Sequence, residues 1–371
     1  MSTAGHPNYG DELITRAWLD ILTELRPDAE VWLDCPHPGR ASHLFRRTHP
    51  NLHVTNTLWE LAHSSPSHDP ISDTERIARH VRDLGTPRID PGLLALRHVT
   101  SVHLLGGGHF NDLWQDNLGI IAAVSALHRE FGISARATGL GLQPLAAERG
   151  DWLREQFSVF DHVEVRDRAS ADAIGSEVGL DDAFLALSVL RPVYDERPSP
   201  ENVVLVQGDL RAWSDIDAIR SIDDFLADAP DNEAAFVEAL PPDDARYIAD
   251  TRPSARFYSF GNIWFDGLPA RPGQRWLTTR FHAHLLAAAA GAAGTVIAGQ
   301  EGYYDHKHAS LLELGTGWTV VPAGSVAEPT VDPDFPARAR EHAAAKRRLA
   351  ERLYPAEHRA SASPGRSPMG A

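Results

Sequence analysis

The chain has 371 residues, of which 43% are hydrophobic and 23% charged, and its formal net charge is −16 at pH 7. This length exceeds a usual single core and predicts two domains, while the acidic balance argues against a nucleic-acid partner. No apolar run is long enough for a membrane span, and residues 1–14 lack the order of a secretion signal. The single cysteine, Cys35, cannot form an internal disulfide, so we expect a cytoplasmic protein.

Strands and helices are predicted to alternate through the first half of the chain. In chain order these are a helix at 10–25, strands at 29–35 and 98–108, a helix at 118–132, strands at 133–141 and 162–167, and a helix at 168–179. Continuous apolar strands that alternate with helices indicate a parallel sheet covered on both faces.

A stretch rich in proline and charge at 191–202 interrupts this pattern, which then restarts. The second half is predicted to contain strands at 202–210, 255–260, 275–279, 294–299 and 318–322. The sequence therefore predicts an α/β fold of two domains that meet at a cleft. We place them at residues 1–195 and 196–345, followed by a helical end and disordered tail at 346–371.

Two motifs of the first half follow predicted strands or begin a helix. Gly106–Gly108 end the strand at 98–108, where glycines let the backbone approach a ligand, although a tight turn alone would also need them. Asn8, Gly10 and Asp11 stand at a helix start, where Asp11 would also complement the helix dipole without any function. In open α/β sheets, ligands bind beyond the carboxyl ends of strands.

Basic residues gather at the ends of two further strands. Arg166 ends the strand at 162–167, where it could pair with its neighbour Asp167 or bind a phosphate or carboxylate. Arg280, His282 and His284 begin a helix directly after the strand at 275–279. Free backbone N–H groups and the helix dipole make such a start suitable for an anion.

The segment 303–308 contains Asp305, His306, Lys307 and His308. Its spacing fits no standard zinc motif, so no metal is expected. A lysine or histidine here could face the same cleft, and we interpret His306 and His308 as residues of a solvated loop.

In their order along the chain, these motifs resemble those of the polysaccharide pyruvyl transferase family. The matching residues are Asn8–Asp11, Gly106–Gly108, Gly139–Pro144, Arg166–Ser170, Asp181–Phe184, Arg280–His282 and Tyr304–Lys307. One departure is Asp182, which replaces the proline usual in the D-P-A-F version of its motif.

The resemblance implies a GT-B-like fold of two Rossmann-like domains facing a cleft, with phosphoenolpyruvate as co-substrate and no other cofactor. The acceptor would be a sugar diol in cell-surface polysaccharide or glycolipid biosynthesis, bound from the first domain. The residues implied for phosphoenolpyruvate are Arg166, Arg280, Phe281, His282 and Lys307. Those expected on the acceptor side are Asn8, Gly107, Gly108 and His109. His282 is the expected general acid, and Asp11 or His109 the group that accepts a hydroxyl proton.

Two other functions stay open at this point. A GT-B glycosyltransferase that uses a nucleotide sugar would share the architecture and the phosphate-binding helix start. A non-catalytic carbohydrate-binding relative would share the fold, but would be expected to have lost the Arg280–His282 pair. A hydrolase is disfavoured because no G-x-S-x-G motif occurs. The sequence does not choose the acceptor sugar, a ketal over an enolpyruvyl product, or a monomer over a homodimer.

Overall fold

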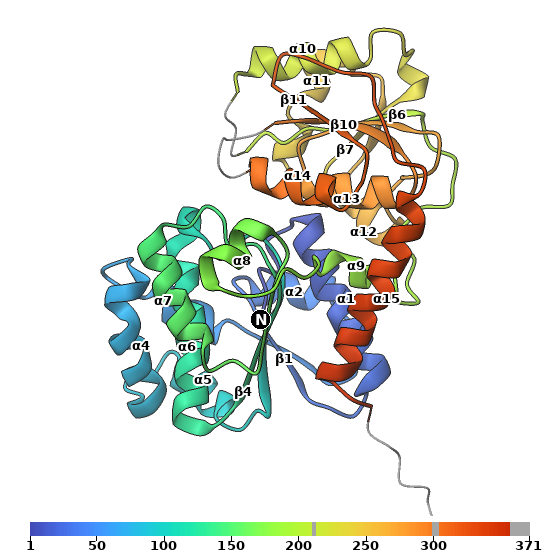
Figure 1. Cartoon of the computed structure of the whole chain (residues 1–371). Helices are drawn as coiled ribbons and strands as arrows, with labels where there is room; N and C mark the ends of the chain where they lie inside the picture. Colours follow the sequence, from blue (N-terminus) through green and yellow to red (C-terminus); the bar gives the residue numbers. More distant parts are fainter. Residues whose placement is uncertain (210–212, 299–303, 357–371) are drawn as a thin grey trace, which may run out of the picture.

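The computed structural model describes residues 1–209, 213–298 and 304–356. Throughout these residues, neighbouring strands within a sheet run parallel. Figure 1 shows the two halves of the chain as two α/β units, one above the other. An α/β fold with parallel strands was predicted from the sequence and is confirmed.

The first half contains a two-stranded sheet, β1-β2, and a three-stranded sheet, β3-β4-β5. Its elements are α1 (Tyr9–Leu25), β1 (Val31–Asp34), α2 (Pro38–Leu44), β2 (Leu52–Thr55), α3 (Thr57–His63), α4 (Pro70–Asp83), α5 (Asp90–Leu96), β3 (Ser101–Leu104), a 3-10 turn (Asp112–Trp114), α6 (Gln115–Phe131), β4 (Ser134–Leu140), α7 (Ala147–Phe157), β5 (His162–Val165), α8 (Arg168–Ile174) and α9 (Ala183–Ala186).

The second half forms one six-stranded sheet in the order β11-β10-β9-β6-β7-β8. Its elements are β6 (Asn202–Leu205), α10 (Asp215–Phe225), β7 (Ala234–Val237), α11 (Ile248–Thr251), β8 (Arg256–Tyr258), α12 (Phe260–Asp266), β9 (Arg275–Thr278), α13 (Phe281–Ala289), β10 (Ala293–Ile297), α14 (Tyr304–Glu313), β11 (Thr319–Val321) and α15 (Phe335–Leu353), with 3-10 turns at Asp231–Glu233 and Asp243–Ala245.

Glycines end two of the predicted helices. α6 stops at Phe131 because Gly132 adopts the left-handed conformation, with φ of 68°, as expected for a C-cap glycine. The helix predicted at 168–179 is shorter than expected, since Gly175 has φ of 70° and ends α8 at Ile174. The residues after Gly175 form a loop rather than helix.

The final helix, α15, returns from the second half to the first. It contacts both α13 and α9, and in Figure 1 it runs from the second half, at the top, down beside α1. α15 begins at Phe335, ahead of the helical end expected from residue 346, and the predicted disordered tail at 357–371 lies outside the described residues. Among the described residues, no helix has the length and apolarity that a membrane crossing would need.

One apolar cluster joins the two halves. It combines Leu13 and Trp18 of α1 and Phe184 of α9 with Trp276 of β9 and Leu286 of α13, all fully buried or nearly so. Burial of this much aromatic and aliphatic surface holds the start of α1 against the start of α13. The residues at these two helix starts therefore face one another across a fixed distance.

Candidate active site

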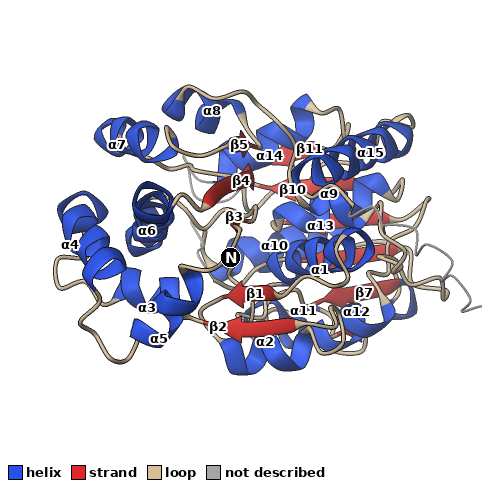
Figure 2. Ribbon diagram, turned by 90° about the horizontal axis from the view of Figure 1, so that it is seen from below, coloured by secondary structure: helices blue, strands red, loops and turns tan. Residues whose placement is uncertain are grey.

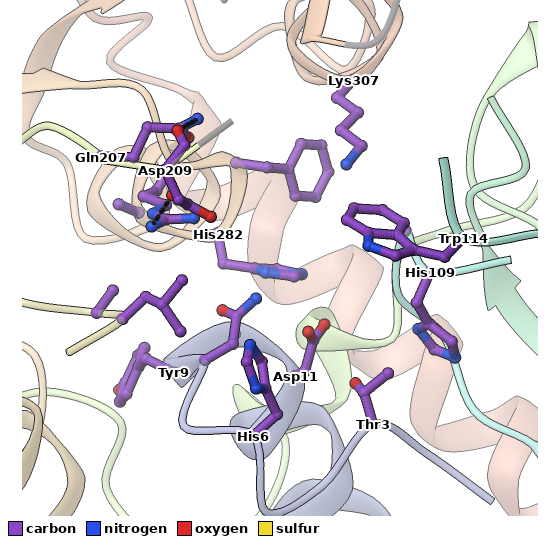
Figure 3. A pocket seen from close by; sticks show the side chains of 18 of the residues that line it. Thr3, His6, Tyr9, Asp11, His109, Trp114, Gln207, Asp209, His282 and Lys307 are labelled. Carbon is purple, nitrogen blue, oxygen red and sulfur yellow. Dashed lines mark hydrogen bonds and ion pairs between the residues drawn. The ribbon is translucent and has the colours of Figure 1, made fainter. Parts of the chain in front are cut away.

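A pocket of about 330 Å³ lies where strand ends from both halves meet. Figure 3 shows side chains that enter it from the first turn of α1, the glycine turn after β3, the loop after β6 and the start of α13. Apart from Gly107, which precedes Gly108, the predicted site residues all line it. They are Asn8, Asp11, Gly108, His109, Arg166, Arg280, Phe281, His282 and Lys307.

The His282 imidazole stands at the centre of the pocket and packs directly on the backbone of α1. A Cβ atom built on Gly10 would lie only 1.8 Å from His282 Nδ1. The ring also makes an edge contact with Phe281, with centroids 5.1 Å apart. Glycine is therefore required at position 10 because the imidazole occupies the space of a side chain.

Asp181 links His282 to Arg166. Its Oδ2 accepts a hydrogen bond from Arg166 Nη1 at 2.7 Å, and its Oδ1 lies 3.5 Å from His282 Nε2. Burial alone would raise the pKa of Asp181, but His282 and Arg166 together hold it well below its ordinary value. Asp181 is thus a buried anion that lies between the Arg166 guanidinium and the imidazole. The sequence motif contained this residue, yet its role was not assigned from sequence.

Arg166 and Lys307 converge at Gly108. A Cβ on Gly108 would lie 2.8 Å from Lys307 Nζ and 3.0 Å from Arg166 Nη2. The Arg166 guanidinium also stacks on Phe281, 4.3 Å from the ring centroid. Burial, and then the charge of Arg166, lower the pKa of Lys307 well below its ordinary value. A buried guanidinium and a buried amine so close together favour an anion between them, because the anion would offset the charge of Arg166 and stabilise the ammonium form of Lys307.

His109 lies beside Asp11 on the opposite wall of the pocket. A Cβ on Gly107 would lie 2.7 Å from His109 Nδ1 and 3.2 Å from Asp11 Oδ1. Burial lowers the pKa of His109 to about 4, so its ring is neutral at pH 7. Neither ring nitrogen has a hydrogen-bond partner among the described residues. A neutral, buried imidazole next to a carboxylate can accept a proton or a hydrogen bond from a ligand hydroxyl.

Arg280 lines the pocket, but its guanidinium is already paired. Its Nη2 donates to Asp244 Oδ1 at 2.5 Å and to Asp209 Oδ1 at 2.6 Å. Asp244 is fully buried and also accepts from the backbone N–H groups of Ala239 and Leu240. Two carboxylates therefore offset the charge of Arg280, and its predicted role in binding the donor together with Arg166 stays a prediction.

The predictions for His306 and His308 have different outcomes. His308 is not a solvated loop residue: it is 2% exposed on α14, and burial lowers its pKa to about 4. Its ring contacts Thr279 O and His284 Nδ1, and His284 in turn contacts Thr316 Oγ1 at 2.8 Å. This buried pair fixes α14 against α13 and so positions Lys307. The His306 side chain lies outside the described residues.

Asp182 supports the glycine turn from below. Its Oδ2 accepts from Gly106 N at 2.9 Å, Trp18 Nε1 at 2.9 Å and Thr138 Oγ1 at 2.7 Å, and its Oδ1 pairs with Lys346 Nζ at 2.6 Å. The residue that departs from the family motif is therefore a buried anchor for the turn, and its cation comes from α15.

Several residues of the pocket, both aromatic and polar, were not predicted from the sequence. Trp59, His63 and Trp114 line its first-half side, while Gln207 and Asp209 approach from the loop after β6. Trp114 follows the glycine turn by a few residues, which was the one signal available in the sequence. Such rings offer flat apolar faces against which the C–H groups of a sugar can pack.

Two halves with parallel strands and a pocket between them at the strand ends define a GT-B-like fold. A solved structure of a Listeria monocytogenes protein assigned as a UDP-N-acetylglucosamine 2-epimerase has the same fold: the TM-score is 0.50 at 10% identity, over 93% of this chain and 88% of that chain. A family model described as polysaccharide pyruvyl transferase matches residues 8–300. The chain belongs to this family, and is accordingly a transferase of polysaccharide biosynthesis. No curated protein matches it.

Proposed function

We propose that the protein transfers pyruvate from phosphoenolpyruvate to two hydroxyl groups of one sugar, forming a cyclic ketal. The observation that carries this proposal is the convergence of Arg166 and Lys307 at Gly108, beside His282. The donor has a phosphate, a carboxylate and a carbon that must be protonated, and this arrangement offers a partner for each.

Arg166 and Lys307 hold the anionic groups of the donor in this proposal. Arg166 presents a planar fork suited to a carboxylate or phosphate, and Asp181 and Phe281 fix its orientation. Lys307 supplies a compact ammonium from the other half of the chain. Because burial and Arg166 lower the pKa of Lys307, an incoming anion would raise it again, and binding would be coupled to protonation.

His282 protonates the methylene carbon C3 of the donor, which becomes a methyl group. The electron pair of the double bond forms the new C–H bond, and C2 becomes an oxocarbenium-like centre stabilised by its phosphate oxygen. One sugar hydroxyl attacks C2 and passes its proton to Asp11 or His109. The C–O bond to phosphate then breaks, the second hydroxyl closes the ring, and its proton leaves with inorganic phosphate.

The sugar occupies the first-half side of the pocket, between the Asp11–His109 pair and Trp114. Asn8 and the backbone at Gly108 line the space between this position and the donor. We place the reaction in the cytoplasm, in keeping with the one free, buried cysteine, Cys35. The acceptor is proposed to be a cell-surface polysaccharide or its glycolipid precursor.

The test is transfer from phosphoenolpyruvate labelled with carbon-13 at C3, incubated in heavy water with the protein and a panel of sugar diols. A ketal product would show a methyl carbon carrying one deuterium, with release of inorganic phosphate. Retention of a methylene signal on the sugar would show enolpyruvyl transfer instead. Transfer of a sugar from a nucleotide sugar, with the labelled donor unchanged, would replace the proposal by a glycosyltransferase.

A further inference from the structure

The sheet of the first half is interrupted between β1 and β3. In residues 1–209, all of which are described, β1 pairs with β2 and β3 pairs with β4, but β1 and β3 share no ladder. A second cavity, of about 860 Å³, lies between these two strands. Parallel sheets of this kind are normally continuous, because each interior strand satisfies backbone groups on both sides.

Met1 and Ser2 bridge β1 and β3 at the carboxyl ends of these two strands. Ser2 N donates to Asp34 O at 3.1 Å, Met1 N donates to His103 O at 2.8 Å, and Leu105 N donates to Met1 O at 3.0 Å. Figure 2 places the N mark between β1 and β3. One backbone thus reaches both strands, so they stand two strand spacings apart, about 9.5 Å. The gap between β1 and β3 is therefore wide enough for one further strand.

Apolar side chains line both faces of the cavity, alongside polar residues such as Thr15 and Arg26. Trp18, Leu19 and Leu22 of α1 line one side, and Leu58 of α3 and Leu96 of α5 line the other. Figure 2 shows α1 and the α3–α5 pair on opposite sides of these strands. A strand placed here would bury the side chains of both its faces, as central strands of parallel sheets do.

We propose that this cavity is the seat of a further β-strand: an extended, apolar peptide segment of four or five residues that runs parallel to β1 and β3 and leads into Met1. The bonds of Met1 to His103 and Leu105 have the parallel pattern, which fixes the direction. β1 and β3 each have four residues, which fixes the length at about 13 Å.

The same pattern fixes the register. Backbone groups of alternate residues point to the same side of a strand, so the residue directly before Met1 would pair with Asp34 and Trp32. The residue before that would pair with His103 and Ser101. With this strand, the first half would have one continuous sheet in the order β2, β1, the new strand, β3, β4, β5.

The test compares two five-residue extensions joined directly before Met1 of the full chain. The first, Thr-Val-Leu-Val-Ile, has strand-forming apolar residues; the second, Thr-Gly-Ser-Gly-Ser, has the same length without them. We expect the first to raise the thermal unfolding midpoint by roughly 5 °C over the second. Hydrogen exchange at the amides of Asp34 and His103 should slow at least tenfold or so in the first alone.

Two substitutions on α5 provide the matched control. Ala95 lines the cavity, whereas Leu94 is 45% exposed on the same helix. Ala95→Trp should abolish the gain in both measurements by filling the seat, and Leu94→Trp should leave it intact. Equal melting and exchange for the two extensions would overturn the proposal, as would a gain that survives Ala95→Trp.

Discussion

At the scale of single residues, the site depends on how closely Gly10 and His282 pack. The imidazole uses the space that any larger residue would need, with 1.8 Å between Nδ1 and the position of a Cβ. Asp181 holds the other side of the ring at 3.5 Å. For the general acid that we propose, this confinement would keep one orientation toward the donor, as proton transfer to carbon requires.

Gly10→Ala should therefore displace the imidazole and lower turnover by at least about a hundredfold. Gly39→Ala is the control, because Gly39 lies in a helix with no atom within 4 Å of the new Cβ. Turnover of both variants, measured beside their melting curves, checks this. Normal turnover in Gly10→Ala would mean that the ring is free to move and that its packing has no catalytic role.

His282→Gln should reduce turnover by about 10²–10⁴-fold while leaving the affinity for phosphoenolpyruvate within a few fold. The reason is that, in the proposed mechanism, the imidazole supplies a proton, whereas Arg166 and Lys307 supply the charge that binds the donor. Steady-state kinetics and calorimetry separate the two effects. A variant that melts earlier but turns over normally would make His282 a structural residue.

Lys307→Met should weaken phosphoenolpyruvate binding by about ten- to a hundredfold, as expected for loss of a buried charge-assisted contact. In the native protein, affinity should also fall as pH rises. Burial and Arg166 lower the pKa of Lys307 in the free protein, and a bound anion is expected to raise it, so binding should take up a proton at a pH between the two values. Calorimetry in buffers of different ionisation enthalpy measures this uptake, and none is expected in Lys307→Met.

Residue types at strand ends allowed much of the site to be predicted from sequence, but not the pairing of their charges. Arg280 stands at a helix start, which correctly placed it in the pocket. Its carboxylate partners are Asp209, from the loop after β6, and Asp244, from the 3-10 turn that follows β7, and neither was among the predicted site residues. Which arginine binds a ligand depends on such long-range pairs, and sequence spacing does not contain them.

At the scale of elements, α15 connects the end of the chain to the glycine turn. Lys346 is 1% exposed and pairs with Asp182 and Glu164 at 2.6 Å each, and Asp182 holds Gly106 N. The glycine turn, which lines the pocket, is therefore supported by α15, a helix that follows the sheet of the second half. A helical end was predicted here but not its pairing with Asp182, because nothing in the local sequence distinguishes a lysine that will be buried from one on the surface.

Lys346→Met should cost about 3–5 kcal/mol of unfolding free energy, because it leaves the buried Asp182 carboxylate without its cation. The adjacent Arg347 pairs with Glu24 at a partly exposed site, and Arg347→Met should cost no more than about 1 kcal/mol. Adding Asp182→Asn to Lys346→Met should recover part of the loss. Equal effects of the two single variants, measured by denaturant unfolding, would exclude the anchoring role.

At the scale of the whole molecule, most of the predicted strands that the structure confirms contain valine, leucine or isoleucine, although β4 has only one such residue and β8 has none. β2 and β7 were not predicted. β7 reads Ala-Ala-Phe-Val, with alanine where strand formers are usual, and β2 is a four-residue strand with one exposed and three partly exposed positions. Both are strands because neighbours pair with them, β1 for β2 and β6 and β8 for β7. Tertiary pairing of this kind overrides local propensity.

Buried histidines make the folded state sensitive to acid. The pKa of His109 and of His308 is lowered to about 4, so between about pH 6.5 and 4 the unfolded chain binds protons that the folded chain excludes. Stability should therefore fall as pH decreases through this window. His109→Leu should reduce the loss of unfolding free energy between pH 7 and pH 4 by roughly 3 kcal/mol, measured by denaturant unfolding at both pH values. An unchanged loss would mean that the imidazole at position 109 is charged or exposed in the folded chain.

We propose that phosphoenolpyruvate binds where Lys307 meets Arg166, and the chain's two lysines, Lys307 and Lys346, allow a direct test. Protein labelled with carbon-13 at lysine Cε would give one nuclear magnetic resonance signal for each. Titration with phosphoenolpyruvate should move the Lys307 signal toward the protonated position, leave Lys346 in place as the internal control, and saturate at one equivalent. A nucleotide sugar should move neither signal. A Lys307 signal that ignores phosphoenolpyruvate, or that responds to the nucleotide sugar instead, would contradict the proposed donor.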